Sequence, residues 1–313
     1  MLDTAREPLL SAEQLLGENG AALAASPLAD ACMYAISQPG KQLRSRLVVE
    51  ASRVGGLDDP RVVLAARAVE LLHAATLAHD DVVDDSPLRR GRASLDSELG
   101  GFAAAYAGTW LFSTAIELAT RCGDETLALF ARSASEICDG ELLETQDLHN
   151  PDRTRERYLS SITGKTAMLF AVSARSGGLL GGAPPDVCLE LERYGLQLGI
   201  AFQLADDILD LLGDDDAIGK EPGNDIRHGV FTLPTIYAVE ADPDLRELLT
   251  GDRVERELPL IIDRIHSTGA CARALGVCDE HAAAARAAAR EIGASALETF
   301  VDRALMRLDG LRE

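Results

Sequence analysis

An acidic pattern, Asp-Asp-x-x-Asp, occurs twice in this chain, at residues 80–84 and at residues 206–210. Each copy ends a long apolar stretch. On a helix, this spacing places the first and third carboxylates on one face, one turn apart, with the second close beside them. Like charges on an otherwise buried helix are costly unless a cation such as Mg²⁺, which prefers oxygen ligands, neutralises them. The predicted metal ligands are Asp80, Asp81, Asp84, Asp206, Asp207 and Asp210.

Two other interpretations fit the acidic pattern less well. A solvated helix end would explain one copy, but two copies with the same spacing, both after apolar stretches, favour metal binding. A calcium loop of the EF-hand type requires Asp-x-Asp-x-Asp-Gly, which the sequence does not contain.

Basic residues beside glycine form short clusters in a chain whose formal net charge is −21. These clusters occupy residues 40–44, 86–92, 164–166 and 219–220. Arg and Lys next to Gly suit phosphate, because side chain and backbone can both approach it. Solvated charge at a helix end would explain any single cluster. Two carboxylate motifs together with several cations instead imply a metal-chelating anion, for which a diphosphate is the simplest candidate.

His73 lies seven residues before Asp80, two helical turns back on roughly the same face. As a lone helical histidine, it is either an ordinary core or surface residue or a donor to a second phosphate group. The residues alone leave both interpretations open.

Composition narrows the class of protein and its compartment. The 313 residues include 30 Lys and Arg against 51 Asp and Glu, which argues against nucleic acid or an anionic membrane surface as a partner. The six cysteines include no CxxC pair and fit a reducing cytoplasm. No basic segment followed by an apolar one opens the chain, and no run reaches the roughly 18 apolar residues of a membrane span. We expect a cytoplasmic protein without stable membrane insertion.

The elements that position these residues are expected to be helices. Alternating β-branched runs are nearly absent, whereas Ala and Leu recur at helical spacing between Gly and Pro breaks. Asp59-Pro60 predicts the start of a helix that ends at the first acidic motif, and Pro184-Pro185 the start of the helix that carries the second. Further helices are expected at about residues 102–121, 124–147, 154–176, 252–266, 279–291 and 295–309. The pattern predicts a single all-α domain, residues 1–313, built as a helical bundle.

Two segments carry a resemblance to a known family. The first is His-Asp-Asp-Val-Val-Asp-Asp-Ser-Pro-Leu-Arg-Arg-Gly, residues 79–91. The second is Phe-Gln-Leu-Ala-Asp-Asp-Ile-Leu-Asp, residues 202–210, with Gly219-Lys220 and Thr232-Leu233-Pro234 after it. In these motifs the chain resembles the trans-isoprenyl diphosphate synthases (polyprenyl synthetases), over roughly residues 38–240.

The resemblance implies a helical bundle around a deep central apolar cavity, usually assembled as a homodimer. It also implies head-to-tail coupling of an allylic diphosphate with isopentenyl diphosphate, with the six aspartates holding Mg²⁺ that bridges the allylic diphosphate. Further contacts to the allylic diphosphate are implied for Arg89, Lys165, Thr166, Gln203 and Lys220. Of these, Arg89 and Lys165 join the aspartates as catalytic groups. The residues implied to hold isopentenyl diphosphate are Lys41, Arg44, His73 and Arg90.

The chemistry of this reaction explains the residue types. Metal ions and cationic side chains stabilise the charge that develops on the departing diphosphate, so that the C–O bond can ionise. A dry apolar pocket protects the resulting allylic cation from water. The double bond of isopentenyl diphosphate attacks this cation, and the departing diphosphate is the expected base for the proton then lost. Val230 stands where many relatives carry Lys, so one cation of the family pattern is replaced in this chain.

Three residues are expected to limit the length of the product. In family members with short products, an aromatic residue commonly lies four or five residues before the first aspartate. Those positions hold Thr76 and Ala75 here, and Leu72 lies one turn further back. Aromatic residues make up only 4% of the chain, so few side chains can close the tunnel. We expect a medium- to long-chain synthase whose all-trans product has at least twenty carbons.

Two alternative functions use a similar fold. A class I terpene cyclase usually carries an Asn/Ser/Glu-type second metal motif, whereas this chain keeps a second Asp-Asp-x-x-Asp together with Lys41, Arg44 and His73. A non-catalytic subunit of a heteromeric prenyl synthase loses acidic residues, whereas this chain keeps all six. Both alternatives fit the sequence less well than a prenyltransferase does.

Overall fold

The computed structural model of the protein describes residues 9–37, 40–83, 88–89, 92–212, 222–251 and 253–311. Its contacts divide the chain into two compact units, residues 1–132 with 172–189 and residues 133–171 with 190–313. The divisions fall inside three helices, α8 (Asp124–Gln146), α10 (Met168–Leu180) and α11 (Pro185–Leu212). That residues 1–313 form a single domain stays a prediction.

The all-α fold class is confirmed, because the only strands among the described residues are two short ones that pair as an antiparallel hairpin. The other elements of the first unit are α1 (Ala12–Leu16), α2 (Asn19–Ala24), α3 (Ala29–Ile36), α4 (Leu43–Gly55), α5 (Arg61–Val83), β1 (Leu88–Arg89), β2 (Arg92–Ala93), α6 (Leu95–Leu99) and α7 (Gly101–Cys122). Those of the second unit are α9 (Arg155–Ile162), the π-helix η1 (Thr163–Ala167), α12 (Asn224–Arg227), α13 (Leu233–Ala241), α14 (Leu245–Leu248), α15 (Arg253–Ser267), α16 (Ala270–Glu291), α17 (Ser295–Leu305) and the 3-10 helix η2 (Met306–Leu311).

Predicted helix boundaries agree with the structure where capping residues mark them. α5 begins directly after Asp59-Pro60, where a side-chain oxygen of Asp59 accepts the N–H of Arg61 at 2.8 Å. α16 begins at Ala270, nine residues before the expected start at 279. Gly276 lies inside this helix with open space around it, and an isolated helical Gly costs only about 1 kcal/mol relative to Ala.

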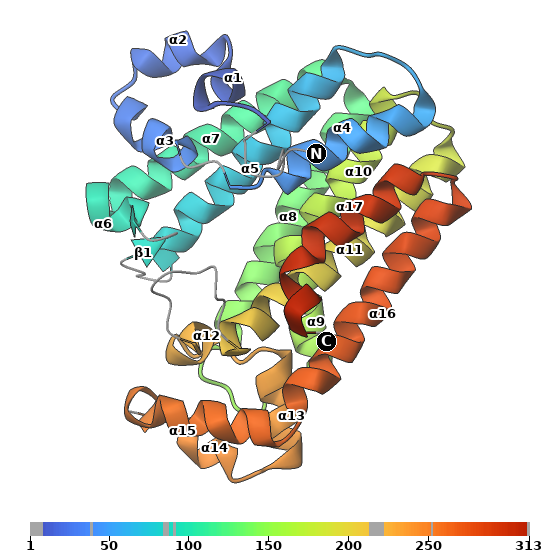
Figure 1. The fold of residues 1–313 in the computed structure, drawn as a ribbon. Coiled ribbons are helices and arrows are strands. Elements are labelled where there is room, and N and C mark those ends of the chain that lie inside the picture. Colours follow the sequence, from blue (N-terminus) through green and yellow to red (C-terminus); the bar gives the residue numbers. More distant parts are fainter. Residues whose placement is uncertain are drawn as a thin grey trace. The chain divides into compact units, whose positions relative to one another are not determined.

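In the first unit, α5 packs along α7 at close range (Figure 1). A Cβ atom on Gly108 of α7 would lie 2.5 Å from Nε2 of His79 and 3.1 Å from the carbonyl oxygen of Ala75, so a larger residue here would have to displace the His79 ring. By length and apolar composition, α5 is the one described helix that could cross a membrane, although no apolar run was expected to be long enough. Of its apolar window, 56% is buried within the fold, as in the core helices of soluble proteins.

In the second unit, η1 crosses α8 at two glycines. A Cβ atom on Gly164 would lie 2.4 Å from the carbonyl oxygen of Glu136, and one on Gly140 would lie 2.3 Å from the backbone nitrogen of Lys165. Neither position has room for a side chain, and the two backbones therefore touch. Because π-helical turns often occur at functional sites, this crossing points to Lys165 and its neighbour Thr166.

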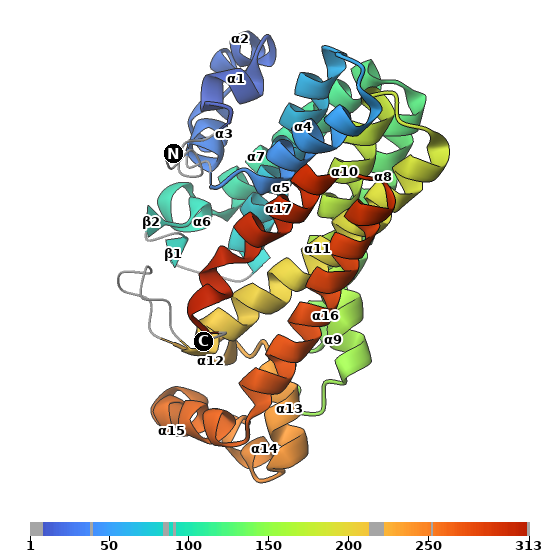
Figure 2. The same ribbon diagram turned by 45° about the vertical axis from the view of Figure 1, so that its right-hand side comes forward.

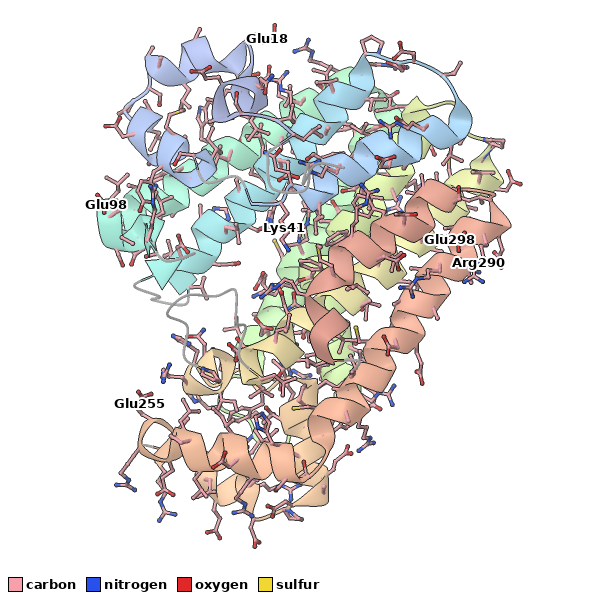
Figure 3. All side chains as sticks on the ribbon, in the orientation of Figure 1. Glu18, Lys41, Glu98, Glu255, Arg290 and Glu298 are labelled. Atoms are coloured by element: carbon pink, nitrogen blue, oxygen red, sulfur yellow. The ribbon has the colours of Figure 1, made fainter. Side chains whose placement is uncertain are left out.

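The C-terminal helices of the second unit pack against one another. α16 and α17 lie side by side (Figure 2), and Nε of Arg290 pairs with Oε2 of Glu298 at 2.9 Å on their surface (Figure 3). The buried hydroxyl of Tyr194 on α11 donates to the carbonyl oxygen of Leu297 at 2.8 Å and so attaches α17.

Candidate functional site

The first acidic motif lies at the C-terminal end of α5, and its second carboxylate is bound to the protein itself. Asp81 is 3% exposed, and its Oδ2 accepts the backbone N–H of Leu95 at 2.8 Å. Leu95 opens α6 next to the N-cap residue Ser94, so the carboxylate supplements that cap at the positive end of the helix. Asp80 is half-buried, and Asp84 lies outside the described residues.

The basic residues predicted in the first unit are only partly described. Lys41 is exposed (Figure 3), Arg44 is half-buried in the first turn of α4, and His73 is half-buried on α5. The backbone of Arg89 belongs to β1, whereas its side chain lies outside the described residues, as does all of Arg90.

Gln42 fixes the backbone between Lys41 and Arg44, a role that no sequence pattern indicated. Its φ is +48°, in the left-handed region, and it is 5% exposed. Its Nε2 donates to the carbonyl oxygen of Leu10 at 2.8 Å, and its Oε1 accepts the N–H of Leu10 at 2.8 Å. A non-glycine residue in this conformation persists only where surrounding contacts hold it, often at functional sites. The two hydrogen bonds therefore set the start of α4.

The residues predicted to limit product length lie on one stretch of α5. Leu72 and Ala75 are each 1% exposed. Thr76 is half-buried, and its hydroxyl donates to the carbonyl oxygen of His73 at 2.8 Å. Ala75 is thus packed inside the first unit, whereas Thr76 keeps part of its surface accessible.

The second acidic motif lies near the C-terminal end of α11, and its carboxylates differ in their surroundings. Asp206 and Asp210 are half-buried, one helical turn apart, whereas Asp207 is 3% exposed. Oδ1 of Asp206 accepts from Nη1 of Arg307 at 2.9 Å, and Oδ2 of Asp210 accepts the N–H of Asp225 at 3.1 Å. The helix therefore presents two partly accessible carboxylates on one face, as the spacing predicts, and buries the third.

Two side chains donate hydrogen bonds to the buried carboxylate of Asp207. The hydroxyl of Tyr158 donates to Oδ2 at 2.5 Å, and Nε2 of Gln203 donates to Oδ1 at 2.7 Å. Oε1 of Gln203 in turn accepts the hydroxyl of Thr166 at 2.8 Å. Burial raises the pKa of Asp207 to about 7. The hydrogen bonds from Tyr158 and Gln203 lower this pKa, and the nearby carboxylate of Glu144 raises it. The predicted residues Thr166, Gln203 and Asp207 thus form one connected set, and Tyr158 is an addition that the sequence did not reveal.

Lys165, at the centre of η1, pairs with two glutamates of α8. Its Nζ lies 2.8 Å from Oε2 of Glu141 and 2.7 Å from Oε1 of Glu144, and its side chain is 24% exposed. Neither glutamate was predicted as a site residue.

The remaining predicted cation, Lys220, lies outside the described residues. At the position of the replaced lysine, Val230 is half-buried, and its N–H donates to the carbonyl oxygen of Asp225 at 2.8 Å.

The second motif suits a divalent cation. Within the described ranges, no three His, Cys, Asp or Glu side chains gather as a complete metal site. At phosphate-binding sites, however, Mg²⁺ commonly takes one or two carboxylates and completes its shell with phosphate oxygens and water. Asp206 and Asp210 offer such a pair. Burial, followed by the carboxylates of Asp210 and Asp207, raises the pKa of Asp225 well above its usual range. Several carboxylates thus lie close together here, and a cation would neutralise part of their charge.

Residues 25–257 match the sequence profile of the polyprenyl synthetase family. The chain belongs to this family. Among these polyprenyl synthetases, heptaprenyl diphosphate synthase component 2 of Geobacillus stearothermophilus is 33% identical over 289 residues, covering 91% of this chain and 84% of the relative. Nonaprenyl diphosphate synthase of Mycobacterium tuberculosis is 36% identical over 265 residues, covering 83% of this chain and 79% of the relative. A crystal structure of polyprenyl synthase from Caulobacter crescentus, complexed with calcium and isoprenyl diphosphate, has a TM-score of 0.84 and 32% identity, covering 96% of this chain and 98% of that chain.

Each unit of this polyprenyl synthetase brings part of the predicted residue set together. In the first unit, the N–H of Ser45 donates to Oε1 of Glu70 at 2.9 Å and so joins the start of α4 to α5. Arg44 precedes Ser45 on α4, and His73 follows Glu70 by three residues on α5. In the second unit, η1 and α11 are joined by the hydrogen bond between Thr166 and Gln203. Glu70 joins Gln42 as a residue that the sequence analysis missed.

Proposed function

We propose that this polyprenyl synthetase couples an allylic diphosphate head to tail with isopentenyl diphosphate, uses Mg²⁺ as its cofactor, and releases an all-trans polyprenyl diphosphate of at least twenty carbons. One observation carries the proposal. α11 presents two half-buried aspartates beside the hydrogen-bonded set of Asp207, Gln203 and Thr166, which continues into the π-helix of Lys165. Oxygen ligands for a metal, and a cation and a hydroxyl for phosphate, are thereby gathered in one unit.

In the second unit, the chain's own residues would bind and orient the allylic diphosphate. Asp206 and Asp210 would hold Mg²⁺ with Asp207 behind them. Lys165 would bind diphosphate oxygens, and Thr166 would bind them once its hydroxyl donates to the ligand in place of Gln203. When bound, Mg²⁺ supplies positive charge that stabilises the departing diphosphate. Lys165 adds positive charge to the same group, and a fixed cation costs no reorganisation when the C–O bond breaks. Gln203 would also contact this diphosphate. Lys220, which lies outside the described residues, is proposed to contact it as well.

The first unit has a corresponding set. The motif Asp80, Asp81 and Asp84 would bind Mg²⁺ together with diphosphate. Isopentenyl diphosphate would be held by Lys41, Arg44, His73 and Arg90. The hydrogen bond between Ser45 and Glu70 supports this second assignment, because it joins the two helices that carry Arg44 and His73.

Two aromatic side chains pack together beside Gln203 in the second unit. Phe202 precedes Gln203 on α11, and its ring centroid lies 5.4 Å from that of Phe170. Water would quench an allylic cation, and an apolar surface excludes it. The departing diphosphate remains the proposed base for the final proton.

Product length follows from the small residues on α5. Ala75 and Thr76 provide no aromatic barrier before Asp80, which supports a product of at least twenty carbons. The names of the heptaprenyl and nonaprenyl diphosphate synthases among the relatives support the same class of product.

We further propose a homodimer formed through α7. Two aromatic side chains one turn apart are strongly exposed on this helix, Phe102 at 86% and Tyr106 at 63%. Exposed aromatic residues on neighbouring turns of one helix are typical of an interface, and a second copy of the chain is the simplest occupant.

The double substitution Phe102→Ser and Tyr106→Ser should convert a dimer into a monomer in analytical ultracentrifugation. A monomeric wild-type protein would overturn the dimer without affecting the proposed reaction.

We also propose a cytoplasmic location, without nucleic-acid partners and without stable membrane insertion. All six cysteines are free, four of them buried, which fits a reducing compartment. The net charge of −21 disfavours nucleic acid.

The reaction is tested by incubating the purified protein with Mg²⁺, labelled isopentenyl diphosphate and, separately, C10, C15 and C20 allylic diphosphates. The dephosphorylated products are then separated by chromatography. We expect a ladder of products that ends at one chain length of at least twenty carbons. Hydrocarbon formed without isopentenyl diphosphate would instead identify a terpene cyclase, and no turnover would identify a subunit that requires a second chain.

A further inference from the structure

The hydroxyl of Tyr158 is directed at the second acidic motif from inside the second unit. Tyr158 is 1% exposed and lies on α9, and its hydroxyl donates to Oδ2 of Asp207 at 2.5 Å. Because Gln203 donates to the other oxygen at 2.7 Å, both oxygens of the buried carboxylate are bound and its rotamer is fixed. A buried carboxylate that loses a donor bears a large desolvation cost, so the bond matters most where water does not reach.

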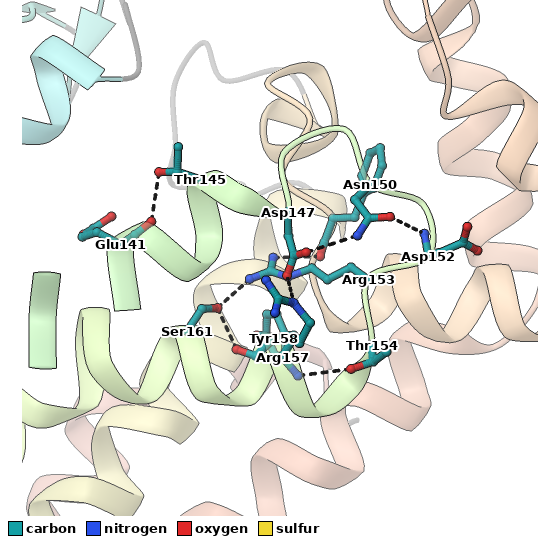
Figure 4. Close-up of polar contacts among 11 residues, drawn as sticks. Glu141, Thr145, Asp147, Asn150, Asp152, Arg153, Thr154, Arg157, Tyr158 and Ser161 are labelled. Carbon is teal, nitrogen blue, oxygen red and sulfur yellow. Dashed lines mark hydrogen bonds and ion pairs between the residues drawn. The ribbon is translucent and has the colours of Figure 1, made fainter. Parts of the chain in front are cut away.

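A cluster of charged residues surrounds Tyr158 on α9 and in the segment before it (Figure 4). The guanidinium carbon of Arg153 lies 5.3 Å from the centroid of the Tyr158 ring. Arg153 donates through Nη1 to the carbonyl oxygen of Phe231 at 3.1 Å and through Nη2 to the hydroxyl of Ser161 at 2.5 Å. Its side chain is only 1% exposed, so this cation is a fixed part of the interior.

Asp147 balances the charge of this buried arginine. Its Oδ2 lies 3.6 Å from Nε of Arg153 and accepts from Nε of Arg157 at 2.7 Å, while its Oδ1 accepts from Nδ2 of Asn150 at 3.1 Å (Figure 4). The segment between α8 and α9 is thereby tied to α9 on both sides of Tyr158. A buried ion pair of this kind contributes little net stability on its own and is better suited to fixing one geometry.

We infer that Tyr158 is a positioning residue for the second acidic motif: its hydroxyl fixes Asp207, and through Gln203 it fixes the hydroxyl of Thr166. The inference rests on the proposed function. Asp206 and Asp207 lie on the same turn of α11, so the two hydrogen bonds to Asp207 hold the segment of helix that carries the proposed metal ligand Asp206. In this site the hydroxyl reaches the motif proposed to hold metal.

The chain offers a matched control in Tyr194. It is also buried, at 0% exposure, and its hydroxyl donates to the backbone carbonyl oxygen of Leu297 at 2.8 Å, away from the acidic motif. Tyr158→Phe and Tyr194→Phe therefore each delete one buried hydroxyl and its hydrogen bond in the same unit. Both variants keep the ring that fills the core, so both should fold.

The experiment compares the melting temperature of each variant with and without MgCl₂ plus inorganic pyrophosphate, and then its kinetics. A ligand that binds only the folded state raises the melting temperature by an amount set by its affinity. Without ligand, we expect Tyr158→Phe to lose at least as much melting temperature as Tyr194→Phe, because it removes a donor from a buried carboxylate and not from a neutral carbonyl group. Only Tyr158→Phe should weaken the apparent affinity for Mg²⁺ plus pyrophosphate, by about tenfold, the scale of one hydrogen bond to a charged group. It should also raise KM for the allylic diphosphate and leave KM for isopentenyl diphosphate unchanged.

A double-substitution cycle with Asp207→Asn tests the contact itself. If the hydroxyl acts through Asp207, Tyr158→Phe should weaken pyrophosphate affinity far less in the Asp207→Asn background than in the wild type. The inference is overturned if Mg²⁺ plus pyrophosphate raises the melting temperatures of Tyr158→Phe and Tyr194→Phe equally, or if the effects in the cycle are fully additive. The proposed function stands in either case. A wild-type protein that neither responds to Mg²⁺ plus pyrophosphate nor turns over overturns the proposed function itself.

Discussion

Nζ of Lys165 lies 2.7 Å from Oε1 of Glu144, so a cation proposed to bind diphosphate is paired with a carboxylate in the free protein. The two side chains are 24% and 18% exposed, which leaves the pair within reach of solvent and of a ligand. Diphosphate would have to replace Glu144 as the partner of Lys165. On the proposed role of Lys165, the pair would lower the affinity of the free enzyme for diphosphate.

Glu144→Gln should lower KM for the allylic diphosphate, because Lys165 then loses a competing carboxylate. A partly exposed ion pair contributes up to about 1 kcal/mol, which corresponds to at most about a fivefold change in KM. Asp139→Asn serves as the control, since it removes the same charge from an exposed position on α8. An unchanged KM in Glu144→Gln, or an equal fall in both variants, would show that the contact does not compete with substrate.

Asp206→Ala should lower turnover by at least about a hundredfold, the scale for loss of a group that stabilises transition-state charge. The side chain is 44% exposed, and its pair with Arg307 adds little stability, so circular dichroism should show a folded protein with a nearly unchanged melting temperature. Arg307→Gln breaks the same pair and keeps the carboxylate. It should retain turnover, and a loss as large as that of Asp206→Ala would assign the effect to the ion pair. Asp80→Ala should behave as Asp206→Ala does.

Thr76→Phe should shorten the product, because an aromatic ring would then lie on α5 one turn before Asp80. Thr76 is half-buried and can accept the ring more easily than Ala75, which is 1% exposed and where overpacking costs about 1–3 kcal/mol. Chromatography of the dephosphorylated products reports the change. Val63→Phe, at a site on α5 that is 51% exposed, controls for an added ring and should leave the product unchanged. If Thr76→Phe yields the wild-type distribution, Thr76 does not limit chain length.

His281 should make the fold less stable as the pH falls below about 6.5. Burial lowers the pKa of His281, the carboxylate of Glu280 raises it, and the charge of Arg155 lowers it further. Nδ1 of His281 lies 2.7 Å from Oε1 of Gln197. Since the unfolded chain protonates this histidine first, the stability it contributes is complete above the unfolded pKa and is lost as the pH falls toward the folded pKa.

Urea unfolding of the wild type and of His281→Gln at pH 7.5 and pH 5.5 measures this contribution. Asp207, whose pKa is about 7, titrates in the same range, so only the difference between the two proteins isolates the histidine. The wild type should lose more unfolding free energy between the two pH values than the variant. Equal losses would contradict the assignment.

Much of this protein follows from local sequence. Helical spacing of Ala and Leu predicted the all-α fold, and Asp59-Pro60 predicted the start of α5, because capping depends on residues within one turn. The spacing of the second acidic motif likewise predicted that Asp206 and Asp210 share a face, since residues four apart on a helix always do. The family followed from the same motifs, which the match over residues 25–257 confirms.

The tertiary structure decided what each carboxylate contacts. Asp206 and Asp207 are the same residue type at neighbouring positions, so the motif alone does not show that Asp207 is the buried one. The difference comes from Tyr158, which lies 49 residues away in the sequence and donates to Asp207. The partner of Asp81 lies 14 residues away, and Glu144 lies 21 residues from Lys165. The sequence by itself therefore determined which groups are present and how they repeat along a helix. Only packing decided which of them are buried and paired, since desolvation and hydrogen bonding depend on neighbours that the chain brings together in three dimensions.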